Sequence, residues 1–135
     1  MADNGRPAPT DQREKAIAVV KASYDAYVAK DRAALERILS DDFHFTSPLD
    51  NRLERATYFA RCWPNSAKLR DFEFVNLATV DGETVFVTYI ATNSEGERFQ
   101  NTEIMTVRDG KIAEVDVYFG WSLPHEAKLG GFINQ

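Results

Sequence analysis

The sequence predicts an α+β fold, in which three N-terminal helices pack on a strongly curved, mostly antiparallel sheet and form a cone. Two observations carry this prediction. Apolar residues recur at helical spacing up to about residue 63, whereas from residue 71 onward they alternate with polar residues as in strands. Asp109-Gly110, a strong signal for a tight hairpin turn, separates the last two alternating runs.

The helices are expected in the first half of the chain. Asp11 and Glu14 resemble a capping box that starts the first helix. A second, shorter helix is expected to end at residues 40–42. Residues 51–54 are expected to cap a third helix running to about Trp63, where the following proline forbids continuation.

The strands begin with a short run, Phe43 to Pro48, in which Phe43, Phe45 and Ser47 share one face. Four longer strands follow, and the Gly-containing turns between them make consecutive strands antiparallel. Their expected ranges are 71–80, 84–93, 98–108 and 111–121. A curved sheet closed by helices leaves a cavity suited to a small molecule.

The 135 residues are expected to form one domain, residues 11–135, after a disordered tail at residues 1–10. Residues 122–135 are expected to lie over the pocket mouth or at a dimer edge. The net charge of -5 argues against nucleic-acid and anionic-membrane partners. With no apolar run long enough to span a membrane and no signal-peptide pattern, a cytoplasmic location is expected.

No metal or cofactor is expected. His-x-His, Cys-x-x-Cys and dense acidic spacings do not occur in the sequence, nor does a glycine-rich phosphate loop. The single cysteine, Cys62, allows no internal disulfide and is expected to be a buried small side chain.

The candidate catalytic residues lie on the strand predicted at 98–108. Asn101, Glu103 and Met105 fall at every second position and therefore share a face. A carboxyl group among apolar neighbours on an inward face has a raised pKa, which suits a general acid or base near neutral pH. We expect Glu103 and Asn101 to be catalytic. The alternative is that Glu103 faces solvent or forms a structural ion pair with one of three arginines, Arg52, Arg55 or Arg61.

The other expected pocket-lining residues are mostly aromatic or apolar and lie on the predicted inward faces. For the tyrosines of the first helix and for Trp63, ordinary core packing is the alternative. Asp50, near the predicted mouth, is read as a turn or capping residue, and His125 as a surface histidine. The expected lining residues are Tyr24, Tyr27, Phe43, Phe45, Ser47, Trp63, Phe99, Met105, Val117, Phe119 and Trp121.

Three local strings resemble the nuclear-transport-factor-2-like superfamily, and within it the SnoaL-like and ketosteroid-isomerase-like proteins. These strings are Ala29-Lys30-Asp31, SDDFHFTSP at residues 40–48 and RDGKIAEVDVYFG at residues 108–120. The resemblance covers about residues 11–121 and implies the cone-shaped fold and a homodimer formed through the outer sheet face. The superfamily includes isomerases, cyclases, epoxide hydrolases and binding modules, so the resemblance does not fix an activity.

Ketosteroid isomerases have three functional residues, and the resemblance finds a matching residue type at only one of these positions in this sequence. Ser47 stands where the resemblance implies an aspartate base, and a serine cannot replace that base near neutral pH. A gapless match puts Ser23, with Tyr24 beside it, at the oxyanion-hole tyrosine. Glu103 falls at or near the second oxyanion donor, a carboxyl kept neutral by its apolar surroundings. The resemblance therefore argues against steroid isomerisation.

The other two enzyme classes are matched in part. Epoxide-hydrolase-like members have an Arg and an Asp two residues apart on the penultimate strand, where this sequence has Asn101 and Glu103, and an Asp on the last strand. Asp116 is on that strand but is predicted to face outward. SnoaL-like cyclases pair an acidic residue with a histidine, whereas His44 is predicted to point away from the cavity.

Two functions are consistent with the sequence. The first is a cofactor-independent isomerase, cyclase or hydrolase that acts on a small apolar or mixed-polarity molecule, with Glu103 as acid or base. The alternative is a non-catalytic ligand-binding or dimeric association module. A second titratable group near Glu103 would favour the enzyme.

Overall fold

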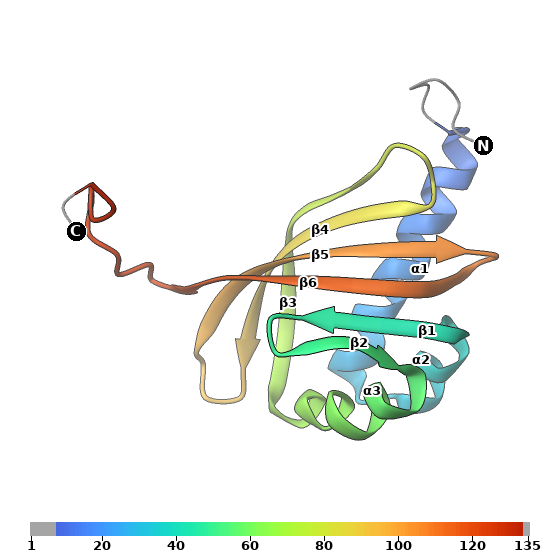
Figure 1. The fold of residues 1–135 in the computed structure, drawn as a ribbon, viewed down its shortest axis with the longest axis horizontal. Helices are drawn as coiled ribbons and strands as arrows, with labels where there is room; N and C mark the ends of the chain where they lie inside the picture. The colour runs from blue at the N-terminus through green and yellow to red at the C-terminus, as the bar shows by residue number, and fades with distance from the viewer. Residues whose placement is uncertain (1–7, 134–135) are drawn as a thin grey trace.

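The computed structural model describes residues 8–133, which form a six-stranded sheet, three α-helices and one short 3-10 helix (Figure 1). The helices are α1 (Thr10–Ala29), α2 (Arg32–Ile38), α3 (Arg55–Arg61) and the 3-10 helix η1 (Trp63–Lys68). The strands are β1 (Leu39–Ser47), β2 (Asp50–Glu54), β3 (Leu69–Thr79), β4 (Thr84–Asn93), β5 (Arg98–Arg108) and β6 (Lys111–Leu123).

The sheet is mostly antiparallel and open, with the strand order β2-β1-β6-β5-β4-β3. Its one parallel pair joins β1 to β6, so the early strand of the first half completes the sheet made by the second half. The long α1 crosses the sheet and contacts β3, β4, β5 and β6, while α2 and α3 lie at the β1 end (Figure 1). The result is the predicted α+β architecture, a curved sheet wrapped around helices.

The core forms between α1 and the inward face of the sheet. Strand alternation supplies one layer of it, because Val85, Val87, Tyr89 and Ala91 are all buried at every second position of β4. From the helical side, Val20 is fully buried. Burying several such apolar side chains stabilises the fold by about 1.5–3 kcal/mol each, so the cone has a real core beneath its cavity.

Two predicted boundaries were wrong in the first half of the chain. Residues 40–42 belong to β1, which starts at Leu39, and do not end a helix. Residues 51–54 form most of β2, a strand that pairs with β1 through Phe45 and Leu53, and only the last of them, Glu54, is the N-cap of α3, without a side-chain capping hydrogen bond. The polar sequence of β2 lacks the alternation of a strand, and pairing with β1 supplies the hydrogen bonds that hold it extended.

The predicted capping box was also wrong. The helix α1 begins at Thr10, its N-cap is Pro9, and no side chain caps it. Residues 1–7 of the tail predicted at 1–10 lie outside the described residues, while the Ala8 N–H donates to the Val80 carbonyl at 2.8 Å.

The C-terminal segment continues β6 to Leu123 and then extends away from the sheet (Figure 1). Its apolar side chains Leu129, Phe132 and Ile133 are exposed, and none of them lines the cavity described below. Cover of the pocket mouth by this segment is therefore not seen within a single chain, and the dimer-edge placement stays a prediction. Within residues 8–133, no helix combines the length and apolar character that crossing a membrane requires.

Candidate functional site

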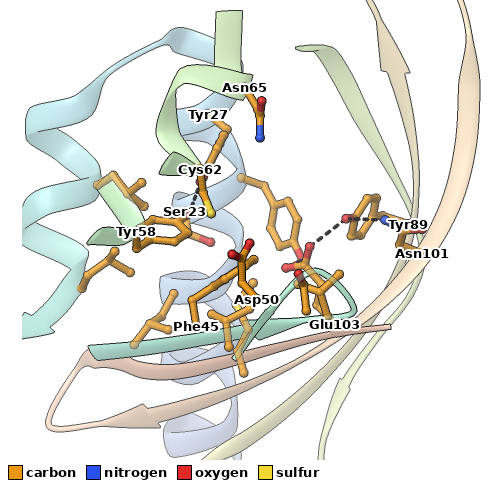
Figure 2. A pocket seen from close by; sticks show the side chains of 18 of the residues that line it. Ser23, Tyr27, Phe45, Asp50, Tyr58, Cys62, Asn65, Tyr89, Asn101 and Glu103 are labelled. Carbon is orange, nitrogen blue, oxygen red and sulfur yellow. Dashed lines mark hydrogen bonds between the residues drawn. The ribbon is translucent and has the colours of Figure 1, made fainter. Parts of the chain in front are cut away.

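A cavity of about 270 Å³ opens between α1, η1 and the inward face of the sheet (Figure 2). Its wall is predominantly apolar and aromatic, with a few polar groups directed inward, as is typical of small-molecule sites. The aromatic rings come from both halves of the chain: Tyr24, Tyr27, Phe43, Phe45, Tyr58, Phe72, Tyr89 and Phe119. Polar lining residues are Ser23, Ser47, Asp50, Cys62, Asn65, Asn101 and Glu103.

Glu103 is the centre of the first polar group. It lies at the middle of β5, and both of its carboxyl oxygens have a tyrosine donor. The Tyr24 hydroxyl, from α1, donates to Oε1 at 3.0 Å, and the Tyr89 hydroxyl, from β4, donates to Oε2 at 2.7 Å. The Asn101 side-chain amide in turn donates to the Tyr89 hydroxyl at 3.4 Å (Figure 2). This network fixes the orientation of the carboxyl group.

Burial raises the pKa of the Glu103 carboxyl above its ordinary value, and the hydrogen bonds from Tyr89 and Tyr24 oppose that rise without cancelling it. The same burial, together with the nearby glutamate charge, raises the pKa of Tyr24 and of Tyr89. Both hydroxyls therefore remain protonated donors. A carboxyl group with a raised pKa can exchange a proton near neutral pH.

The alternative of an arginine partner for Glu103 is wrong. Arg52 pairs with Glu114 at 2.7 Å and Arg61 with Asp50 at 3.3 Å, while Arg55 donates to the Glu36 carbonyl at 2.5 Å. Within residues 8–133, only tyrosine hydroxyls donate to the Glu103 side chain. Because no cationic side chain among the described residues pairs with Glu103, burial raises the pKa of its carboxyl group.

A β-bulge at Gly120 shapes the rim of the site. Opposite it, Asn101 pairs with Phe119 and Gln100 pairs with Trp121, so one residue of β6 is left over. The Gly120 N–H donates to the Asn101 side-chain oxygen at 3.1 Å, and a Cβ at Gly120 would lie 2.1 Å from the Gln100 carbonyl oxygen. Only glycine fits there, and the bulge links β6 to the Asn101–Tyr89–Glu103 network.

Asp50 is a second carboxyl group in the same cavity, and the sequence interpretation as a turn residue missed it. It is the first residue of β2, its side chain is 14% exposed, and it forms an ion pair with Arg61 of α3. Figure 2 shows it in the cavity that also contains Glu103. The signal that would have found it is the pairing of β2 with β1, which a polar five-residue strand does not reveal.

A second polar group consists of Tyr27 and Tyr58, whose hydroxyls are hydrogen-bonded to each other (Figure 2). Tyr27 comes from α1 and Tyr58 from α3, and both line the cavity. Burial raises the pKa of Tyr27 well above its ordinary value. Nearby, burial raises the pKa of the Cys62 thiol to about 11, so it stays a neutral thiol and is a poor nucleophile.

Most of the residues predicted to line the pocket do so in the structure. The lining includes Tyr24, Tyr27, Phe43, Phe45, Ser47, Met105, Val117 and Phe119, as well as Asn101 and Glu103. Of the two neighbouring residues at the oxyanion-hole match, Tyr24 makes the contact with Glu103, while the Ser23 hydroxyl donates to the Val20 carbonyl.

Three predicted lining residues lie elsewhere. Trp63 packs on Tyr27, with ring centroids 5.0 Å apart, and Phe99 packs against the core. Trp121 is half-exposed and stacks on His125. The bulge at Gly120 explains this last error, because it shifts the alternation of β6 by one residue beyond Phe119.

The remaining acid–base candidates are outside the cavity. His44 borders a shallow surface depression with Asp41 and Asp42, as its predicted outward facing requires. Asp116 lies on the outer sheet face beside Glu114, and burial followed by that neighbouring charge raises the pKa of Asp116. Among the described residues, no group of three or more His, Cys, Asp or Glu side chains is placed to hold a metal ion.

Comparison with known proteins places this chain in a family. The family model for the SnoaL-like domain matches residues 20–115, and the protein belongs to that family. Its fold is that of the nuclear-transport-factor-2-like proteins, as solved structures show. No curated protein sequence matches the chain.

Three similar structures illustrate how varied these relatives are. An LEH-like epoxide hydrolase from M. tuberculosis has 21% identity and a TM-score of 0.67, with 81% of this chain and 85% of that chain covered. A candidate SnoaL-like polyketide cyclase from Jannaschia sp. CCS1 has 16% identity and a TM-score of 0.70, with 82% and 88% covered. An NTF-2-like protein of unknown function from Burkholderia xenovorans LB400 has 25% identity and a TM-score of 0.68, with 79% and 84% covered.

Proposed function

We propose that this protein is a cofactor-independent enzyme that catalyses proton transfer on a small, mostly apolar molecule, with Glu103 as the general acid or base. One observation carries the proposal: an arginine-free carboxyl group lies inside an aromatic cavity and is oriented by two tyrosine hydroxyls. Reactions of this class are isomerisation, aldol-type cyclisation and hydration or hydrolysis. The names of two similar structures, an epoxide hydrolase and a SnoaL-like polyketide cyclase, fall within this range.

Asp50 supports catalysis over binding alone, because a two-step proton transfer needs a second group. It forms an ion pair with Arg61, whereas Glu103 has no cationic partner among the described residues and burial raises the pKa of its carboxyl group. In an isomerisation, Asp50 would accept the proton from carbon while Glu103, oriented by Tyr24, would give its proton to the neighbouring oxygen and take it back from the enol. The proton on Asp50 would then return to a second carbon, which leaves both groups as they began.

Ligands are found first by a thermal-shift screen against small carbonyl compounds, lactones and epoxides. Each hit is then incubated with the enzyme in D₂O and followed by mass spectrometry. A proton-transfer enzyme incorporates deuterium at the exchangeable carbon even where no net conversion occurs. We expect incorporation with the wild type and none with Glu103→Gln.

The matched control is Glu114→Gln, which removes a carboxylate from the outer face and should leave exchange unchanged. Ligand binding by wild type and Glu103→Gln alike, with neither exchange nor conversion, would contradict the proposal and favour a non-catalytic binding module.

We also propose that the protein forms a homodimer through the outer face of the sheet. Phe86 of β4 and Tyr118 of β6 are 46% and 55% exposed, and apolar side chains of this size are costly to leave in water. Light scattering at micromolar concentration should give twice the chain mass, and a single-chain mass would contradict the dimer.

A further inference from the structure

Within the part of the chain that the structure describes, the lining of the cavity has no cationic side chain that could pair with an anionic ligand. Two carboxyl groups, Glu103 and Asp50, line it, and no Lys, Arg or His is among its described lining residues. Arg61 pairs with Asp50 from outside the lining, and its side chain is 63% exposed. A carboxylate or phosphate entering the cavity would lose its hydration and gain no cation from the described lining.

The tyrosine pair provides a second hydrogen-bond donor, separate from the Glu103 network. Two hydroxyls carry two protons, and the contact between Tyr27 and Tyr58 uses one of them. The other proton remains available to a ligand. The neighbouring Ser23 hydroxyl does not compete for this role, because it donates to the Val20 carbonyl at 2.6 Å.

The cavity volume limits the size of the ligand. At about 270 Å³, the cavity lies near the lower end of the volumes of about 300–1,000 Å³ that are usual for ligand pockets. A monocyclic molecule, or a small bicyclic one, matches this space.

We propose that the cavity takes a compact, uncharged, mostly apolar molecule with two oxygen groups and rejects carboxylates and phosphates. The Glu103 network would bind one oxygen and the Tyr27–Tyr58 pair the other. The identity of the first oxygen as a carbonyl rests on the proposed function; the selection for neutral ligands and for a second oxygen does not.

The test compares matched probes by chemical-shift titration of the full chain. The probes are hydroxycyclohexanones, hydroxyacetophenones and hydroxy-δ-lactones. Each is compared with the analogue that lacks the hydroxyl and with analogues that carry a carboxylate or an ammonium group in its place. One net hydrogen bond corresponds to about three- to tenfold in affinity, so the hydroxyl compounds should bind tighter than the deoxy analogues by that factor. The carboxylates should bind about tenfold more weakly or not at all.

Two tyrosine variants locate the second donor. In Tyr27→Phe or Tyr58→Phe alone, the remaining hydroxyl has a free proton, so part of the preference should persist. The double variant Tyr27→Phe/Tyr58→Phe keeps both rings and should bind hydroxyl and deoxy probes equally. Circular dichroism and Tm establish that each variant is folded, and the two single variants still test the idea if the double variant does not fold.

Glu103→Gln separates this inference from the proposed function. It should abolish deuterium exchange and keep the preference for the hydroxyl probes. Wild-type selectivity without exchange would contradict the enzyme and leave the ligand class standing. Exchange without a hydroxyl preference would overturn the ligand class and leave the enzyme. Tighter binding of carboxylate or ammonium analogues, or binding of none of the probes, would also overturn it.

Discussion

The two carboxyl groups of the cavity differ in how the fold surrounds them. Glu103 lies in the middle of β5, contacts two tyrosine hydroxyls and has no cationic partner. Asp50 lies at the start of β2, beside Arg61 and close to solvent. Burial without a cation raises the pKa of the Glu103 carboxyl, whereas Asp50 has an ion-pair partner. The comparison teaches that the surroundings of a carboxyl group, more than the residue type, assign its role.

The largest expected effect comes from Glu103→Gln, because glutamine keeps the shape of the side chain and has no carboxyl proton to give or take. We expect turnover of a substrate found in the screen to fall by about 10²–10⁴-fold. Steady-state kinetics measure the loss, and Glu114→Gln is the control. Retained turnover would show that Glu103 does not take part in the reaction. The proposed difference in role between Glu103 and Asp50 would then be wrong.

Asp50→Asn tests the other half of the comparison. If Asp50 is the base, turnover should fall by about 100-fold, while stability should change little. An ion pair of this exposure contributes less than about 1 kcal/mol and weakens in salt. Urea unfolding at low and high salt measures the second part. Equal loss of activity and of folded protein would instead assign Asp50 a structural role.

Gly120→Ala should affect the surroundings of Glu103 and not those of Asp50, because the bulge at Gly120 contacts Asn101 of the Glu103 network. A Cβ 2.1 Å from the Gln100 carbonyl forces the backbone to shift, at an expected cost of about 2 kcal/mol. The control is Gly131→Ala, whose nearest contact would be 3.2 Å, with an expected change below about 0.5 kcal/mol. Equal stabilities for the two variants in urea unfolding would show that the bulge is not required.

The raised pKa of Glu103 also predicts how stability depends on pH. The folded state binds the proton more tightly than the unfolded state, so wild-type stability falls as pH rises from the unfolded pKa of about 4.3 through the folded pKa. Glu103→Gln lacks this loss. Its Tm relative to wild type should therefore rise across that window. A difference in Tm that stays constant with pH would contradict the raised pKa.

Tyr89→Phe gives the smallest effect and tests the hydrogen bonds directly. The Tyr89 hydroxyl lowers the pKa of Glu103, so its removal should raise that pKa further. The Glu103-dependent limb of the activity profile should therefore move to higher pH. Tyr118→Phe, on the exposed outer face, should leave the profile in place, and a shift of the Tyr89→Phe profile to lower pH would contradict the account.

The position of Glu103 in the cavity could be predicted from the sequence because it depends on a local pattern, the alternation of residues along one strand. Alternation along residues 98–108, with the Asp109-Gly110 turn, was enough to place Glu103 and Asn101 on the inward face. The same alternation in β4 carries Tyr89, the partner of Glu103, and could have revealed it. The sequence also gave a recognisable family resemblance, which the SnoaL-like match confirms.

The position of Asp50 in the cavity depends on contacts between segments that are distant in the sequence, and local patterns do not reveal such contacts. The strand β2 is polar and short, and it is extended because β1 pairs with it, while β1 itself is held by parallel pairing with β6. The error at Trp121 is different in kind. A glycine within a strand is a sign of a bulge, and Gly120 was the available signal.

The most direct test of the central claim is a titration of the Glu103 carboxyl by carbon NMR on protein labelled at the glutamate side-chain carboxyl carbon. Glu103→Gln identifies the signal by its disappearance. The account predicts that this signal titrates above the ordinary glutamate pKa of about 4.3, and higher again in Tyr89→Phe. Titration at or below that value would mean that Glu103 is ionised like an exposed glutamate, and would contradict its role as the cavity's proton donor.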